Sequence, residues 1–214
     1  MNLKIERKSM SELITFKQYG KQQNWVDGKV YGPSSEKNIS VISPYYDKEI
    51  AVISDSNAED LNQAVINAKN VFPDWAATNI RDRVEVMYNL KSIMKNDIEQ
   101  LAHLVALDNG KTIADAKGSI LRGMEVIEFA ISLPNLLKGD SSNVSQGITC
   151  TMTNEPLGIV GGITPFNFPI MVPLWMIPTA ITTGNCFILK PSEQTPLAAL
   201  KLAEYFKEAG LPDG

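Results

Sequence analysis

An asparagine held between two prolines is the side chain of this sequence best suited to stabilising an oxyanion. Asn167 lies in residues 161–169, GGITPFNFP, where Pro165 and Pro169 each fix a φ angle and stiffen the loop. A carboxamide NH2 offers two hydrogen-bond donors without a net charge, and such donors can stabilise an oxyanion that develops on an attacked carbonyl. The same side chain could instead hydrogen-bond to its own turn. The residues alone leave both interpretations open.

A cation and a carboxylate follow about twenty residues further along the chain. Lys190 and Glu193 lie three residues apart in residues 186–193, CFILKPSE, with a proline between them. An ammonium that donates and a carboxylate that accepts could together hold a vicinal diol such as a ribose. The alternative is a local ion pair exposed to solvent.

Two short apolar runs must position these groups. Residues 157–163 and 186–190 each predict a buried strand that ends just before one of the polar motifs. A helix is expected between them over 170–183, and a second helix over 195–210, with Thr195 as its N-cap. This βαβα order is the opening of a parallel sheet with crossover helices.

The preceding part of the chain predicts antiparallel strands followed by helices. Residues 25–53 contain turn signals between short apolar runs and predict short antiparallel strands. Apolar residues at spacings of three and four predict helices over 78–96, 97–108 and 112–133. A further helix is expected over 57–72, with the asparagine at its start as the N-cap.

Composition and charge exclude several classes of function. The 214 residues are 44% hydrophobic and 21% charged, with a net charge of -4 and a pI near 5.1, so nucleic acid is not expected as a partner. The longest apolar run, 170–181, is interrupted by prolines and is shorter than the roughly 20 residues that a bilayer requires. Residues 1–20 mix acidic and basic side chains and fit neither a secretory signal nor a transit peptide. A cytoplasmic protein without membrane segments is expected.

The cysteines and the histidine offer little further chemistry. Cys150 and Cys186 lack a CxxC spacing, which favours reduced thiols with a structural or incidental role over a nucleophile or a metal site. His103 is the only histidine and falls among leucines on an expected helix, so a core or surface role is favoured over a catalytic triad. No metal site is predicted.

Taken together, these segments resemble the NAD-binding half of the aldehyde dehydrogenase superfamily. The resemblance is carried by a P-[FW]-N-[FY]-P loop at 165–169 and a K-P-[SA]-E turn at 190–193, and it runs from about Asn24 to Gly214. Three further segments look specifically like the CoA-acylating methylmalonate- and malonate-semialdehyde dehydrogenases. These segments are RGMEVIEFA at 122–130, PNLLKGD at 134–140 and MVPLWM at 171–176.

The resemblance implies roles for individual residues. It assigns Asn167 to the oxyanion hole and the pair of Lys190 and Glu193 to the adenosine ribose of NAD. The backbone that lines the nicotinamide side is implied to be that of Ile163, Thr164 and Phe166.

Arg122 is implied to bind the carboxylate of the substrate. A planar guanidinium suits this role because it can hold a carboxylate through two parallel hydrogen bonds. On the residues alone, an exposed arginine paired with Glu125 at i+3 explains the position equally well.

The implied fold class is α/β: an incomplete aldehyde dehydrogenase-like fold, the start of a parallel Rossmann-type sheet with helices and N-terminal antiparallel strands. We expect a polar, partly helical tail over 1–22, a partial NAD-binding domain over 23–140 and 156–214, and an oligomerisation ribbon over 141–155. Two parallel strands do not make a doubly wound sheet. The chain therefore resembles a fragment that lacks the catalytic domain, with its general-base Glu and nucleophilic Cys.

The implied function of the intact enzyme is NAD-dependent oxidation of (methyl)malonate semialdehyde to an acyl-CoA through a Cys thioester, with coenzyme A as co-substrate. The expected partners are a small-molecule aldehyde and, for the full-length enzyme, further copies of itself in a homo-oligomer. One alternative is a hydrolytic NAD(P)-dependent aldehyde dehydrogenase, and another is a catalytically inactive fragment without the nucleophile.

Overall fold

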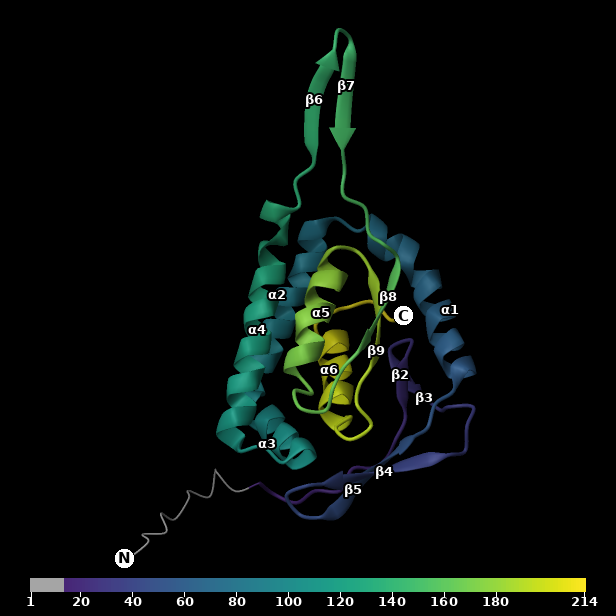
Figure 1. Cartoon of the computed structure of the whole chain (residues 1–214), viewed down its shortest axis with the longest axis vertical. Helices are drawn as coiled ribbons and strands as arrows, with labels where there is room; N and C mark the ends of the chain where they lie inside the picture. Colours follow the sequence, from purple (N-terminus) through teal and green to yellow (C-terminus); the bar gives the residue numbers. More distant parts are fainter. Residues whose placement is uncertain (1–13) are drawn as a thin grey trace, which may run out of the picture.

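The α/β class expected from the sequence is confirmed by the computed structural model, which describes residues 14–214. Within these residues the chain forms six helices and four small sheets (Figure 1). The helices are α1 (Ala58–Ala77), α2 (Ile80–Asn96), α3 (Ile98–Asn109), α4 (Ile113–Leu136), α5 (Met171–Thr182) and α6 (Leu197–Glu208). The strands are β1 (Gly20–Gln22), β2 (Asn24–Val26), β3 (Lys29–Tyr31), β4 (Asn38–Ser43), β5 (Lys48–Ser54), β6 (Asp140–Ser145), β7 (Ile148–Met152), β8 (Ile159–Ile163) and β9 (Cys186–Lys190).

The N-terminal strands form two sheets. β4 pairs with β5, and β2 with β3, both antiparallel as the turn signals predicted. β1 was not foreseen: Gly20–Gln22 lies parallel to β5, although we expected these residues to end a polar tail. The polar side chains of β1 gave no strand pattern in the sequence. The pairing could not be predicted from them, because an edge strand joins a sheet through backbone hydrogen bonds. The remainder of the expected tail, residues 1–13, lies outside the described residues.

Helix α1 begins as predicted but ends later. The Asn57 side chain accepts hydrogen bonds from the N–H groups of Glu59 and Asp60, and the Asp60 carboxylate accepts one from the Asn57 N–H, which makes a capping box. We expected the helix to end near Phe72, but it continues through Pro73 to Ala77. Packing of its buried face outweighs the single backbone hydrogen bond that a proline removes.

The predicted apolar stripes of α2 and α4 form the centre of the core. Met87, Leu90 and Met94 on α2 are fully buried, as are Ile120 and Ile127 on α4. The two helices pack against each other and against α5, which is buried over most of its surface. The stripes are predictable because their spacing of three and four places them on one helix face.

The predicted parallel pair is present at β8 and β9, with α1 and α5 packed against the two strands (Figure 1). The expectation of buried strands was wrong in degree: of the ten residues in the two strands, two are buried, five are half-buried and three are exposed. Each strand pairs only with the other within residues 14–214, so each keeps an open edge there.

Between α4 and β8 the chain makes a two-stranded antiparallel ribbon that projects away from the helices (Figure 1). Every residue of β6 and β7 is exposed. Among the helices that the structure describes, none is both long enough and apolar enough to cross a membrane.

Candidate active site

The loops that carry the two predicted polar motifs begin side by side. Ile163 at the end of β8 is in register with Lys190 at the end of β9, and the Thr164 N–H donates to the Lys190 carbonyl at 3.1 Å. Both loops therefore leave the same end of the parallel pair, beside α3 and the sheet of β4 and β5 (Figure 1). In open α/β sheets, this carboxyl end of the strands is where ligands bind.

The loop of Asn167 is fastened to the turn between α3 and α4. The Asn109 side chain donates from Nδ2 to the Phe166 carbonyl at 2.8 Å, and the Lys111 ammonium donates to the Asn167 carbonyl. The Lys111 ammonium also lies 3.7 Å from the ring centroid of Phe168, a cation–π contact. Neither donor was identified from the sequence, although the expected helix over 97–108 ends within one residue of the observed end of α3.

The two loops are also joined to each other, through Thr195. Its hydroxyl donates to the Phe166 carbonyl at 3.2 Å. The expectation that Thr195 caps α6 was therefore wrong: the helix begins at Leu197 without a side-chain cap from its own segment. The N–H groups of Leu197 and Ala198 instead donate to Oδ2 of Asp108, at 3.0 and 3.4 Å. A carboxylate from the end of α3 thus replaces the local cap that the sequence suggested.

Asp108 has an unusual environment for a carboxyl group. Its side chain is fully buried, and Oδ1 has no hydrogen-bond partner among the described residues. Burial raises the pKa of Asp108 to about 7, and the hydrogen bonds from the Ala198 and Leu197 N–H groups oppose this rise. No sequence signal identified this residue, because burial depends on tertiary packing.

The Asn167 side chain does not bond to its own turn. Its residue is exposed, and its carboxamide makes no hydrogen bond within residues 14–214. The local alternative considered from the sequence is therefore not observed. Since the carbonyls of Phe166 and Asn167 are occupied by donors from elsewhere, the loop presents the Asn167 carboxamide as a free donor.

Lys190 and Glu193 form an ion pair at 3.0 Å, with both side chains largely exposed. A hydrogen bond from the backbone N–H of Glu193 lowers the pKa of its carboxyl group, and the Lys190 ammonium adds to this effect. The solvent-exposed ion pair considered from the sequence is thus present. Both charged groups remain accessible, so a ligand could replace the hydrogen bond between them with hydrogen bonds to itself.

A cleft of about 410 Å³ lies where the two loops face β4. Its lining includes Phe166, Glu193 and Thr195 from the two loops, with Asp108 and Asn109 from the end of α3. Two other residues implied to contact nicotinamide lie at the end of β8: the side chain of Ile163 is 82% exposed, whereas Thr164 is buried.

Arg122 is exposed on α4. Its neighbour Gly123 packs against Met171 and Leu174 of α5, the helix that follows the loop of Asn167. The ion pair with Glu125 that we considered does not form, and within residues 14–214 the guanidinium makes no hydrogen bond or ion pair. Its side chain is therefore accessible to a carboxylate from outside.

The cysteines of the described chain do not provide a nucleophile beside Asn167. Cys186 is buried at the start of β9, and burial raises the pKa of its thiol. Cys150 lies in the projecting ribbon. Within residues 14–214, no group of three or more His, Cys, Asp or Glu side chains could hold a metal ion.

Comparison with known proteins finds the same family that the sequence motifs resemble. The profile described as "Aldehyde dehydrogenase family" matches residues 31–214. A malonate-semialdehyde dehydrogenase of Oceanobacillus iheyensis is 42% identical over 193 residues, which are 90% of this chain and 40% of the relative. The chain thus spans about two fifths of the length of the curated relatives it matches.

Solved structures share the fold. The crystal structure of a methylmalonate-semialdehyde dehydrogenase from Oceanimonas doudoroffii has a TM-score of 0.88 at 37% identity and covers 91% of this chain and 40% of that one. A structure from Sinorhizobium meliloti 1021, complexed with NAD, also has a TM-score of 0.88, at 38% identity, with 93% and 40% covered.

Proposed function

This chain belongs to the aldehyde dehydrogenase family, and from that membership we propose that it supplies the cofactor site and the oxyanion donor of an NAD-dependent, CoA-acylating (methyl)malonate-semialdehyde dehydrogenase. The observation that carries the proposal is the loop of Asn167, whose carboxamide is free while its backbone carbonyls are held by Asn109, Lys111 and Thr195. A rigid, uncharged donor of this kind stabilises charge that develops during a reaction, because it needs no reorganisation at that moment.

In the proposed reaction a cysteine thiolate attacks the aldehyde carbonyl, and the carbonyl oxygen becomes an oxyanion. Asn167 donates a hydrogen bond to that oxygen and lowers the barrier to attack. Cys186 is buried as a thiol and Cys150 lies in the ribbon, so the thiolate belongs to another part of the enzyme. Once the aldehyde carbon has lost its hydride, the acyl group remains bound to the enzyme as a thioester.

The donors and acceptors at the end of β9 fit the ribose of NAD. Lys190 can donate to one hydroxyl while Glu193 accepts from the neighbouring one, and both side chains are accessible. When bound, NAD accepts the hydride that leaves the aldehyde carbon. The backbone of Ile163, Thr164 and Phe166 would line the nicotinamide side, and Ile163 and Phe166 are exposed there.

The finer assignment of substrate rests on relatives that are named as malonate- or methylmalonate-semialdehyde dehydrogenases. We infer that Arg122, whose guanidinium is unpaired within residues 14–214, binds the carboxylate of the semialdehyde. Coenzyme A then removes the acyl group, as the resemblance to CoA-acylating enzymes implies.

The oxyanion role is tested by Asn167→Ala in the complete enzyme. Removing one oxyanion donor typically lowers turnover about 100 to 1,000 fold, so we expect kcat to fall by that factor with little change in the KM for NAD. Steady-state NADH formation measures both quantities. The control is Asn70→Ala, at an exposed asparagine of α1, and kcat should be unchanged there. Normal turnover in Asn167→Ala would remove the proposed role.

The same assay separates the two kinds of aldehyde dehydrogenase. A CoA-acylating enzyme should produce NADH beyond one turnover only when coenzyme A is present, since that thiol releases the thioester. Sustained NADH formation without coenzyme A would favour the hydrolytic alternative.

We also propose that the complete protein is a cytoplasmic homo-oligomer assembled through the β6–β7 ribbon. Every residue of the ribbon is exposed in the isolated chain, including the apolar side chains of Val144 and Ile148. An isolated hairpin is at best marginally stable in water, and pairing with another copy would bury these side chains.

A further inference from the structure

The turn between α3 and α4 contacts both loops of the candidate site. Asp108 receives the first N–H groups of α6, which directly follows the loop of Glu193. Asn109 and Lys111 donate to two successive carbonyls of the other loop, those of Phe166 and Asn167. Three residues between positions 108 and 111 therefore hold the carbonyls of one loop and the start of the helix that follows the other.

Lys111 makes two contacts that a shorter or uncharged side chain would lose. Its ammonium donates to the Asn167 carbonyl and lies 3.7 Å from the centroid of the Phe168 ring. The side chain is only half-buried, yet burial lowers the pKa of Lys111. A charged donor forms a stronger hydrogen bond to a carbonyl than a neutral one, and the ring attracts the same charge.

We propose that Lys111, assisted by Asn109, is a positioning residue that holds the Asn167 carboxamide in the orientation needed to receive the oxyanion. The inference deepens the proposed function and rests on it. It assigns no contact with substrate to Lys111 itself, because both of its contacts are with the loop.

The lack of a hydrogen bond to the Asn167 side chain among the described residues explains why a positioning residue is needed. The Asn167 carboxamide has no hydrogen-bond partner within residues 14–214, so only the backbone of its loop determines where it lies. Pro165 and Pro169 restrict their own φ angles, and Pro169 also restricts Phe168, but neither proline fixes the backbone of Phe166 and Asn167. Hydrogen bonds from Asn109 and Lys111 to the carbonyls of Phe166 and Asn167 restrict this remaining freedom.

The first part of the test is structural. Crystal structures of the complete enzyme would compare the wild type with Lys111→Met, which keeps much of the apolar stem but removes the charge. We expect residues 165–169 to shift or to show raised B-factors relative to the rest of the chain. Asn109→Ala should produce a smaller change, since Thr195 still donates to the Phe166 carbonyl.

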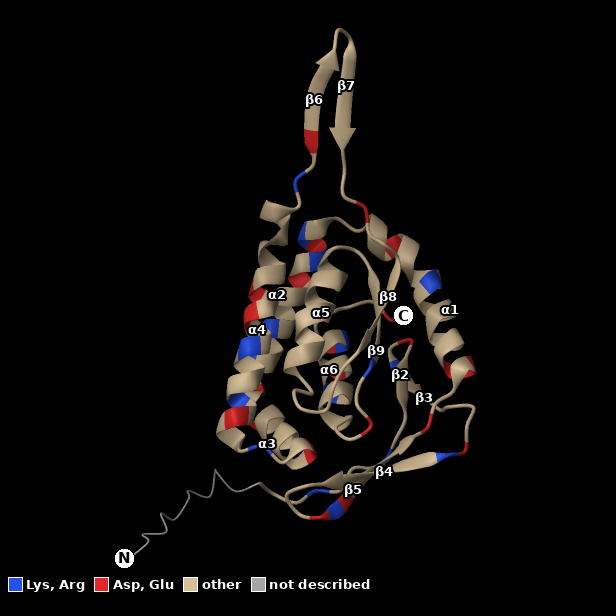
Figure 2. Ribbon diagram, in the orientation of Figure 1, with Lys and Arg blue, Asp and Glu red and all other residues tan. Residues whose placement is uncertain are grey.

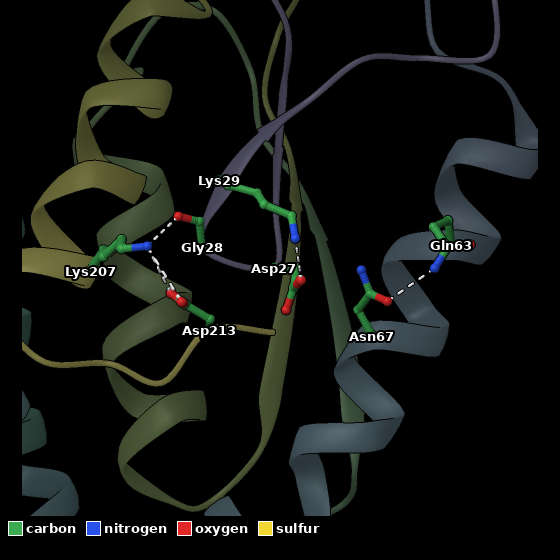
Figure 3. Close-up of polar contacts among 7 residues, drawn as sticks. All are labelled: Asp27, Gly28, Lys29, Gln63, Asn67, Lys207 and Asp213. Carbon is green, nitrogen blue, oxygen red and sulfur yellow. Dashed lines mark hydrogen bonds and ion pairs between the residues drawn. The ribbon is translucent and has the colours of Figure 1, made fainter.

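Lys207→Met is the matched control. Lys207 is also a lysine whose ammonium donates to a backbone carbonyl, that of Gly28, and it pairs with Asp213 (Figure 3). It lies 6.0 Å from the ring centroid of Trp25, so it also has an aromatic neighbour. Because it belongs to the last turn of α6, at the opposite end of that helix from the cleft, its loss should leave residues 165–169 unchanged.

The second part of the test is a double-mutant cycle with Asn167. A small misplacement of a catalytic group can cost on the order of 100-fold, and we expect Lys111→Met to lower kcat about 10- to 100-fold with the KM for NAD nearly unchanged. Adding Lys111→Met to Asn167→Ala should change kcat by no more than ~2-fold, because the group that Lys111 positions is already gone. Lys111→Arg should recover part of kcat, since a guanidinium can donate to the carbonyl and stack on the ring.

Three results would overturn the positioning role while Asn167→Ala remains impaired: an undisturbed loop in Lys111→Met, a normal kcat in that variant, or multiplicative effects in the double variant. Normal turnover in Asn167→Ala would instead overturn the proposed function, and the positioning role with it.

Discussion

At the scale of single residues, burial and partners decide which side chains can do chemistry. Asp108 and Glu193 are both acidic and both line the same cleft. Burial raises the pKa of Asp108 to about 7, whereas hydrogen bonds and a neighbouring ammonium lower that of Glu193. One carboxyl group therefore serves to fix a helix end, and the other stays charged and accessible for a ligand.

The raised pKa of Asp108 predicts a pH-dependent stability. Between its ordinary value of 3.8 and about 7, the folded protein keeps a proton that the unfolded chain releases. The contribution of Asp108 to the free energy of unfolding therefore falls as pH rises through this window, by at most about 1.4 kcal/mol per pH unit.

Asp108→Asn removes the titration, so its stability relative to the wild type should rise from pH 4 to pH 7 in urea unfolding. The control is Asp115→Asn, an exposed residue in the first turn of α4, which should retain the wild-type slope in this window.

The role proposed for Glu193 predicts a loss of cofactor affinity. Glu193→Gln keeps the shape but replaces a charged acceptor, and hydrogen bonds to charged groups contribute about 1.5–3 kcal/mol. We expect NAD binding, measured by calorimetry on the complete enzyme, to weaken about tenfold or more. Glu204→Gln is the matched control, because Glu204 forms the same i,i+3 ion pair with Lys201 on α6. Equal affinities of the two variants would argue against a ribose contact at Glu193.

At the scale of elements, helix periodicity and capping were readable in the sequence, but helix ends and contacts between helices were not. The buried stripes of α2 and α4 and the N-cap of α1 at Asn57 agree with prediction. The end of α1 beyond Pro73 and the cap of α6 by Asp108 depend on packing between elements distant in sequence. The close contact between α4 and α5 was also not readable in the sequence, because the sequence does not show which glycine of α4 faces α5.

Two glycines of α4 should respond in opposite ways to alanine. Gly118 faces open space, so Gly118→Ala should stabilise the protein by about 0.5–1 kcal/mol through helix propensity. A Cβ at Gly123 would lie 2.7 Å from Leu174 Cδ1 and 3.4 Å from the Met171 Cα on α5. Overpacking costs about 1–3 kcal/mol, so Gly123→Ala should be net destabilising. Thermal unfolding of both variants measures the difference in stability. Equal stabilisation by both would contradict the prediction and would mean that α5 shifts to accommodate the added Cβ.

At the scale of the whole molecule, the projecting ribbon is unlike the rest of the chain. Figure 2 shows charged residues distributed over the helices but none along the ribbon beyond its base. The ribbon also exposes Val144 and Ile148, at 61% and 56%. An exposed strand edge with apolar side chains and no charge is a template for pairing with another strand. This supports the proposed role of the ribbon in assembly.

Charges placed on the ribbon should therefore break up the oligomer. Because an unpaired charge is costly to bury, Val144→Asp with Ile148→Asp should lower the mass of the complete protein measured by sedimentation. Its circular dichroism should be unchanged, since both side chains are exposed in the isolated chain. Ile66→Asp, at an exposed position of α1, is the control and should leave the mass as it was. An unchanged mass in the ribbon variant would exclude assembly through these residues.

The sequence by itself determined the family, the parallel pair of β8 and β9, and the stiff loop that carries Asn167. These are local properties: apolar periodicity, proline geometry and short motifs act within a few residues of one another. Only the tertiary structure decided that Lys111 and Asn109 hold this loop and that Asp108 caps α6. Such contacts join residues more than fifty positions apart, where the packing of helices, rather than any spacing in the sequence, brings a donor to its acceptor.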